Sequence, residues 1–323
     1  MSKVIRLGSR TSPLAVAQTE IIAAKLKAHF PEYTYEIVTK ATLGDEVQNK
    51  ALYAFGGKAL WTSELEALLV DDAGVNKIDL IVHSLKDLPT NLPNQFELGG
   101  IFDREDPRDA LVVRSDLPYK TLEELPEGSV VGTSSVRRTA QLRRRYPKLE
   151  FKVVRGNMST RLSKLEDKEQ GYTCIIVAIM GLKRIGLDHH ITQFLSAPDL
   201  LYAVGQGALG VEIRKGDEFI KSLLQPAVDR KGTIECVAER SLMRKLEGGC
   251  SVPLGVQSTF TGTELKIEAC VVSPDGSQIA SADLVAPVST IEQAEQFGKD
   301  IAALLLENGA GPILEQINYD RIN

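Results

Sequence analysis

The feature that most constrains the fold is an alternation of short apolar runs with amphipathic runs through the first two-thirds of the chain. Residues 3–8 (KVIRLG) read as a strand. A helix is expected from Ser12, as N-cap, to Phe30, with Pro13 at its first position. A strand over 35–40, a helix over 64–72 and a strand over 78–84 (IDLIVHS) follow. Such alternation is typical of βα units around a mostly parallel sheet.

A second set of strand and helix patterns follows a charged, turn-rich stretch at residues 103–109 (DREDPRD). We expect this stretch to cross between two domains. The second set begins with a strand at residues 110–114, includes a short helix at 121–125 (TLEEL), and ends with a strand at 174–179. A glycine-punctuated run, residues 204–213 (VGQGALGVEI), reads as a strand that could return to the first domain.

The pattern changes near residue 233. One long helix is expected over residues 233–246, and it ends at Gly248-Gly249, a pair that stops helices. Three apolar stretches then predict an antiparallel meander, and a helix over 290–308 follows. A chain of 323 residues exceeds one ordinary core, so two or three domains are expected.

Charge and cysteine usage limit the classes of function. The net charge of −5 gives no overall basic field for nucleic acid or an acidic membrane. Between Ser135 and Lys164, however, ten Lys and Arg stand against one acid, Glu150, which indicates a site for an anion. Four widely spaced cysteines form no CxxC pair and predict neither a metal site nor a disulfide framework. With no signal peptide and no apolar run of membrane-spanning length, the chain is expected to be cytoplasmic.

Charged side chains follow the expected strands where those strands end. The strand over 78–84 runs directly into Lys86 and Asp87, and ligands of open α/β sheets bind outside the carboxyl ends of strands. An Asp at this place could stabilise positive charge that develops in a reaction. The alternative is that Asp87 caps a turn before Pro89 while Lys86 is solvated.

A second group of candidates lies in the basic stretch. The sequence GTSSVRR (132–138) places hydroxyls and Arg137 and Arg138 where a strand meets a helix, a position that favours anions. Arg155 ends the next strand, and Arg161 lies one turn into the following helix. The alternative is a solvated basic face, which suits Arg143 to Arg145 at a helix C-terminus.

Cys250 differs from the other cysteines, because it follows Gly248-Gly249 in a loop just beyond a helix end. Such a thiol is accessible for covalent chemistry, although exposure and pKa decide reactivity. Cys174, Cys236 and Cys270 lie inside expected strands or a helix and read as small core residues.

Together these segments resemble the hydroxymethylbilane synthase (porphobilinogen deaminase) family over nearly the whole chain. The matching stretches occur in the family's order and include GSRTSPLA (8–15), DLIVHSLKDLPT (79–90), VVGTSSVRRTAQL (130–142), VRGNMSTRLSKL (154–165) and AERSLMRKLEGGCSVPLG (238–255). Each is more particular than a generic glycine pattern. After about Gln257 the resemblance is weaker.

The resemblance implies an α/β fold of three domains. The first two would be like type II periplasmic binding proteins, and the third would be a small antiparallel sheet with helices that bears the reactive cysteine. The implied boundaries are 1–104 plus about 204–226 for domain 1, 105–203 for domain 2 and 227–323 for domain 3.

The resemblance also implies the chemistry. Family members carry a covalent dipyrromethane primer, joined by a thioether to the cysteine that matches Cys250. Each incoming porphobilinogen loses ammonia to give an electrophilic methylene pyrrolenine, which the free α-carbon of the growing chain attacks. After four additions, hydrolysis releases the linear tetrapyrrole hydroxymethylbilane, a precursor of porphyrin and heme. The enzyme would be a monomeric transferase that binds neither nucleic acid nor membrane.

The implied site residues fall into three groups. Asp87 and Lys86 would be catalytic, with Asp87 accepting hydrogen bonds from pyrrole N–H groups and stabilising cationic intermediates. The cofactor would be bound by Cys250, Ser84, Lys86, Asp87, Thr133, Ser134, Ser135, Arg137 and Arg138. Substrate would be bound by Arg10, Ser12, Gln18, Lys58, Arg155 and Arg161.

One residue departs from the family pattern. Members often have a lysine where this chain has Ser63, which with Glu66 instead fits a helix capping box.

Two other classes of function compete with the enzyme. A non-catalytic anion binder or sensor would share the architecture but would not need Cys250 or Asp87. A nucleic-acid binder is disfavoured by the acidic total charge and by few aromatics in the basic stretch.

Overall fold

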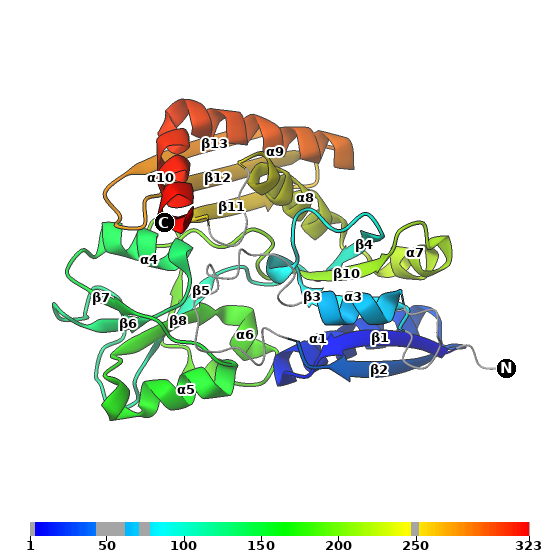
Figure 1. Ribbon diagram of the computed structural model, residues 1–323, viewed down its shortest axis with the longest axis horizontal. Coiled ribbons are helices and arrows are strands. Elements are labelled where there is room, and N and C mark those ends of the chain that lie inside the picture. The colour runs from blue at the N-terminus through cyan, green and yellow to red at the C-terminus, as the bar shows by residue number, and fades with distance from the viewer. Residues whose placement is uncertain (1–3, 43–61, 71–77, 247–251, 323) are drawn as a thin grey trace.

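The computed structural model describes residues 4–42, 62–70, 78–246 and 252–322 and places three sheets (Figure 1). The first sheet has the order β2-β1-β3-β10-β4, the second β7-β6-β8-β5-β9, and the third β11-β12-β13. The expected class is confirmed: a mixed α/β architecture with a small antiparallel sheet and helices near the C-terminus.

The first sheet is mixed, because one distant strand enters it in the opposite direction. Its strands are β1 (Val4–Arg10), β2 (Thr34–Lys40), β3 (Leu80–Ser84), β4 (Phe96–Phe102) and β10 (Leu209–Arg214), with helices α1 (Pro13–His29), α3 (Ser63–Leu69) and α7 (Glu218–Leu224). β1 pairs in parallel with β2 and β3, whereas β10 is antiparallel to both β3 and β4. The glycine-punctuated run of residues 204–213 thus supplies a strand of this sheet.

The second sheet repeats this plan. It contains β5 (Asp109–Val113), β6 (Val130–Gly132), β7 (Glu150–Lys152), β8 (Cys174–Ala178) and β9 (Gln193–Leu195), with α4 (Val136–Arg145), α5 (Met158–Glu166) and α6 (Ile179–Lys183). β6 is parallel to β7 and β8, and β5 is antiparallel to β8 and β9. The helix expected over 121–125 is wrong: these residues form turns that end before Pro126, and Leu122 and Leu125 are buried.

Two chain crossings join the first two sheets and lie side by side. One leads from β4 to β5, and the other leads from β9 to β10. The Glu105 N–H donates to the Gly207 carbonyl at 3.2 Å. Gly207 has φ +90°, and a Cβ at this position would lie 2.6 Å from the Glu105 carbonyl oxygen. Only glycine fits the second crossing at this point.

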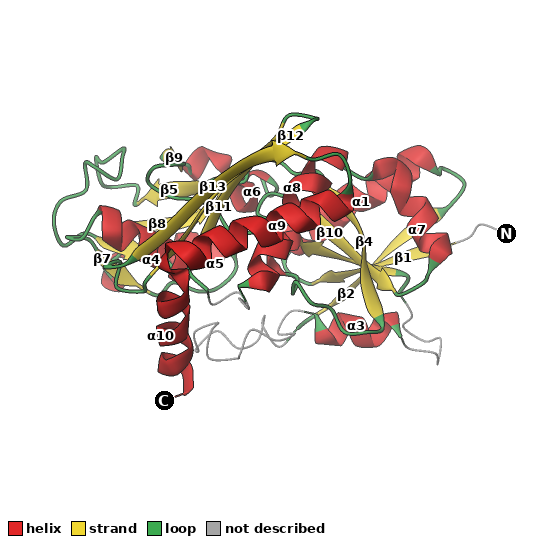
Figure 2. Cartoon of the chain, turned by 90° about the horizontal axis from the view of Figure 1, so that it is seen from above, coloured by secondary structure: helices red, strands yellow, loops and turns green. Residues whose placement is uncertain are grey.

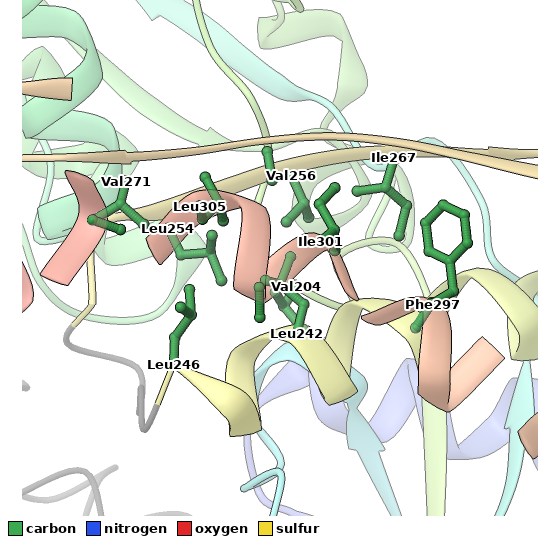
Figure 3. Packing of buried hydrophobic residues seen from close by; sticks show 14 of the residues in the cluster. Val204, Leu242, Leu246, Leu254, Val256, Ile267, Val271, Phe297, Ile301 and Leu305 are labelled. Carbon is green, nitrogen blue, oxygen red and sulfur yellow. The ribbon is translucent and has the colours of Figure 1, made fainter. Parts of the chain in front are cut away.

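The third sheet is the expected antiparallel meander, confirmed as β11 (Leu254–Phe260), β12 (Glu264–Val272) and β13 (Ile279–Pro287). The helices α8 (Arg230–Lys245), α9 (Ile291–Leu305) and α10 (Gly311–Ile322) accompany it. Figure 2 shows α9 lying along this sheet, and α10 leaving at a steep angle. Leu242 of α8, Val256 of β11 and Ile301 of α9 are fully buried in one apolar cluster (Figure 3).

Helix starts agree with the sequence at one place and disagree at another. Ser12 caps α1 as expected, and its hydroxyl accepts a hydrogen bond from the Ala15 N–H at 3.3 Å. The capping box at Ser63 is wrong, because Thr62 is the N-cap and the Ser63 hydroxyl donates to Glu64 at 3.0 Å.

Within the described chain, every helix is too short or too polar to cross a bilayer.

Candidate functional site

The turn that follows β3 carries Lys86 and Asp87. A single-turn 3-10 helix, η2 (Leu85–Asp87), begins where β3 ends at Ser84. Leu85 is fully buried and Leu88 is 2% exposed, so two apolar anchors flank the two charged residues. Because one 3-10 turn is weak by itself, packing of these leucines fixes where the charged side chains lie.

Lys86 faces a polar network that spans the first two sheets. Its ammonium group donates to the Gln206 side-chain oxygen at 3.2 Å, and the Gln206 amide donates to Asp109 at 2.9 Å. Burial lowers the pKa of Lys86 to about 8, with Arg138 and Arg137 acting in the same direction and Asp87 and Asp109 opposing them. An amine with this pKa is mostly cationic at pH 7 and loses its proton in mildly alkaline solution.

Asp109 at the start of β5 holds both arginines of the GTSSVRR segment. Its two carboxylate oxygens accept from Arg137 at 2.8 Å and from Arg138 at 2.7 Å. Burial opposes the charged form, but the two guanidinium groups outweigh it and hold the pKa of Asp109 well below its usual range. Arg137 also donates to the Leu201 carbonyl, and Arg138 to the Ile176 carbonyl.

These contacts show what Arg137 and Arg138 do within the protein itself. They are only 5% and 6% exposed, and they secure the start of α4 against β5. Binding of cofactor carboxylates by the same two residues stays a prediction.

Arg143 and Arg144, expected on a solvated face, are exposed but also donate to backbone carbonyls of the turn between β12 and β13.

Arg155 and Arg161 have the strongest character of ligand-binding cations. Arg155 is 7% exposed, and its buried Nη1 has no hydrogen-bond partner among the described residues. Arg161 donates through Nε to the Gly156 carbonyl at 2.8 Å. Burial, together with the positive charges of Arg138 and Arg155, lowers the pKa of Arg161 to about 10, against the opposing charge of Asp87. Asp87 therefore lies within electrostatic range of cations from the second sheet.

The neutral candidates take part in local hydrogen bonds. The Ser135 hydroxyl caps α4, the Thr133 hydroxyl accepts from the Ser135 N–H, and Ser134 donates to the Val154 carbonyl at 2.5 Å. Gln18 of α1 and Ser84 at the end of β3 contact each other at 2.9 Å. Arg10 ends β1 in the same sheet.

Two predicted site residues, Lys58 and Cys250, lie outside the described residues. Cys250 belongs to the segment between α8 and β11. The other cysteines are buried, as expected of core residues. Burial raises the pKa of Cys174 and Cys236 to about 12 and that of Cys270 to about 11, which leaves these thiols protonated and unreactive.

Sequence reasoning missed Asp109 and Gln206, which connect the predicted cations. A general signal existed for Asp109, because adjacent arginines that enter a core require a carboxylate partner.

A cavity of about 330 Å³ lies elsewhere, in the part of the chain that forms the second sheet, and is lined by Arg114, Glu166 and His189 among others. None of the predicted site residues lines it.

The residues around Asp87 fit a cofactor that carries several carboxylates. The unpaired Arg155 nitrogen is costly unless an acceptor reaches it. Buried Arg138 and half-buried Lys86 and Arg161 add positive charge around Asp87. Acetate and propionate groups supply the anionic acceptors that such a set requires.

Comparison with known proteins gives one consistent family. The family model described as "Porphobilinogen deaminase, dipyromethane cofactor binding domain" matches residues 5–222, and "Porphobilinogen deaminase, C-terminal domain" matches residues 233–307. The porphobilinogen deaminase of Yarrowia lipolytica is 52% identical over 317 residues, covering 98% of this chain and 94% of its own length. That of Saccharomyces cerevisiae is 48% identical over 323 residues, with 99% of both chains covered.

Solved structures with partial similarity include a periplasmic binding protein and a lipoprotein. The periplasmic aliphatic sulphonate binding protein SsuA from Escherichia coli aligns with a TM-score of 0.39 and 12% identity, covering 97% of this chain and 89% of its own. The lipoprotein Tp32 from Treponema pallidum aligns with a TM-score of 0.42 and 13% identity, covering 71% and 92%.

Proposed function

The chain belongs to the porphobilinogen deaminase family, and from that membership we propose the roles of its individual residues. The protein is a transferase that makes hydroxymethylbilane from porphobilinogen in tetrapyrrole biosynthesis. Dipyrromethane is its cofactor.

Asp87 is proposed as the carboxylate at the reaction centre. The observation that carries this role is its place at the end of β3, within electrostatic range of Arg161 and Lys86. A carboxylate oxygen there accepts a hydrogen bond from a pyrrole N–H and stabilises positive charge on the ring as ammonia leaves the substrate.

Arg155 and Arg161 are proposed to bind the acetate and propionate groups of substrate and growing chain. Arg155 brings a buried nitrogen without a partner, and Arg161 brings a guanidinium whose positive charge is disfavoured until an anion arrives. Lys86 adds a third cation, which Gln206 orients at 3.2 Å. Arg137 and Arg138 add positive charge near Lys86, while Asp109 holds them in place.

Cys250 is proposed to hold dipyrromethane through a thioether. The bound group supplies the free pyrrole α-carbon to which substrate is added. Support comes from the remaining cysteines, which are all buried thiols with raised pKa values in β8, α8 and β12. A substituent of two pyrrole rings at any of them would break close packing.

Asp87→Asn and Cys250→Ser test these roles together. We expect Asp87→Asn to keep the adduct and lose turnover by roughly 10²–10³-fold, because one electrostatic contact to the reacting centre disappears. Cys250→Ser should lack the adduct by intact mass and be inactive. Porphobilinogen consumption by Asp87→Asn within a few-fold of the parent protein, or an adduct on Cys174, Cys236 or Cys270 by peptide mass spectrometry, would contradict the assignment.

We further propose a monomer that works in the cytoplasm and folds as three domains. The three separate sheets and their clusters of buried apolar residues support a division into 1–104 plus about 204–226, 105–203 and 227–323. Light scattering on the purified protein at micromolar concentration measures the oligomeric state. A mass of twice the 35.3 kDa chain would exclude the monomer.

A further inference from the structure

One face of α8 contacts the segment that immediately follows Asp87. Cys236, Arg240 and Arg244 are spaced four residues apart and therefore lie on the same side of the helix. Cys236 is fully buried in a cluster with Leu85 and Leu88, the two anchors of the Lys86–Asp87 turn. The helix thus packs on the turn from the side of the third sheet (Figure 1).

Arginines of this face donate to three successive carbonyls beyond the turn. Arg240 binds the Leu88 carbonyl at 2.9 Å and the Pro89 carbonyl at 2.7 Å. Arg244 binds the Thr90 carbonyl at 3.2 Å and also contacts Glu295 of α9 at 3.5 Å. Arg240 is only 4% exposed, so its two hydrogen bonds are shielded from water.

The segment needs these donors. Residues 88–90 lie outside every strand of the first sheet. Leu88 is buried, so its carbonyl requires another donor, while Pro89 and Thr90 are half-buried. Within the turn, the Leu88 N–H reaches the Leu85 carbonyl at 3.2 Å. Charged donors form stronger hydrogen bonds than neutral ones, and the planar guanidinium of Arg240 fixes two carbonyls at once.

We propose that Arg240 and Arg244 are positioning residues that hold the Lys86–Asp87 turn against α8, so that the reactive carboxylate moves with the helix leading into the segment of Cys250. The proposal rests on the function proposed above for Asp87 and Cys250. Arg240 carries the larger share, because its side chain is buried and makes two contacts, while Arg244 is partly exposed. Neither arginine needs to touch substrate for this role.

The test uses the holoenzyme with Arg240→Gln, Arg240→Lys and Arg244→Gln. Arg230→Gln is the matched control. Arg230 lies on the same helix, but it donates at 3.0 Å to the Ser289 carbonyl, between β13 and α9, and not to the segment after Asp87. We expect Arg240→Gln to lower kcat about 10- to 100-fold with little change in KM, because small misplacement of a reacting group is costly. Arg240→Lys should recover part of the loss, Arg244→Gln should cost less, and the control should match the parent protein.

Amide hydrogen exchange of residues 85–92 provides a readout that does not depend on turnover. Exchange there should rise in the Arg240 variants while α9 stays protected and the adduct mass is unchanged. Asp87→Asn should lose turnover without faster exchange, which separates failure of this inference from failure of the proposed function. Parental kcat in folded Arg240→Gln, or loss of protection spread evenly over α8 and α9, would overturn the proposal. Should Arg240→Gln not fold, Arg240→Lys and Arg244→Gln decide by the same two measurements.

Discussion

At the scale of single residues, Arg155 combines burial with a nitrogen that no protein group satisfies among the described residues. Its side chain is 7% exposed, one nitrogen has no partner among the described residues, and burial lowers its pKa. An unsatisfied buried donor costs about 1–3 kcal/mol. A residue that keeps such a cost is explained if a ligand carboxylate supplies the missing acceptor.

Arg155→Leu should therefore impair substrate use more than it impairs folding. We expect kcat/KM for porphobilinogen to fall by at least about 10-fold, the equivalent of one charged hydrogen bond, while the midpoint of thermal unfolding changes little. Arg161→Leu should act similarly. Arg143→Leu is the control, because Arg143 is exposed and its contacts, with the Pro274 carbonyl and the Phe151 ring, lie at the surface. Equal losses in Arg155→Leu and Arg143→Leu would favour a diffuse basic surface over a defined carboxylate site.

Single residues also show where sequence reasoning stops. The sequence placed Lys86 and Asp87 at a strand end because local apolar periodicity defines the strand. It did not reveal that Asp109 would hold Arg137 and Arg138, since that contact joins residues 28 and 29 positions apart across two elements. Ser63 misled for a different reason: the helix begins one residue earlier, with Thr62 as N-cap, so Ser63 already lies inside α3 and cannot cap it.

At the scale of elements, segments with clear apolar periodicity were predictable, including short strands, whereas one short helix was not. The pattern at Ser12 and Pro13 identified the start of α1, and the meander of β11 to β13 followed from alternation. The five-residue helix at 121–125 failed, because a helix this short gains little from propensity and Pro126 ends it. The antiparallel direction of β5 depends on the path of a crossing, which periodicity does not encode.

The two crossings give a prediction at this scale. Gly207→Ala should lower the midpoint of urea denaturation more than Gly171→Ala. Both glycines have positive φ, +90° and +71°, so each alanine costs about 1–2 kcal/mol of backbone strain. Only at Gly207 would the new Cβ meet backbone, the Glu105 carbonyl oxygen at 2.6 Å, which adds about 1–3 kcal/mol. Equal midpoints for the two variants would mean that the crossings can separate without cost.

At the scale of the whole molecule, polar networks connect the three sheets. Asp109 joins β5 to α4 and, through Gln206 and Lys86, to the turn after β3. Arg104 on the first crossing contacts Glu235 at 3.2 Å and Glu239 at 2.7 Å, both on α8. The proposed reaction centre thus lies where charged side chains, rather than apolar contacts alone, set the relative positions of the units.

Asp109→Asn should weaken this arrangement and change its pH dependence. Removing the carboxylate leaves two buried guanidinium groups without their counter-charge, which typically costs about 3–5 kcal/mol in the free energy of unfolding. Because the folded-state pKa of Asp109 is depressed, its contribution is present above the unfolded-state pKa of about 4 and is lost as pH falls below it. Urea denaturation at pH 7 and at successively lower pH should show a variant that is less stable at pH 7 and loses less stability on acidification.

Asp116→Asn is the control, since Asp116 pairs with Arg114 and Lys168 at the surface and should change the midpoint of urea denaturation little. A variant with parental stability at pH 7 would show that Asp109 does not hold the first two units together.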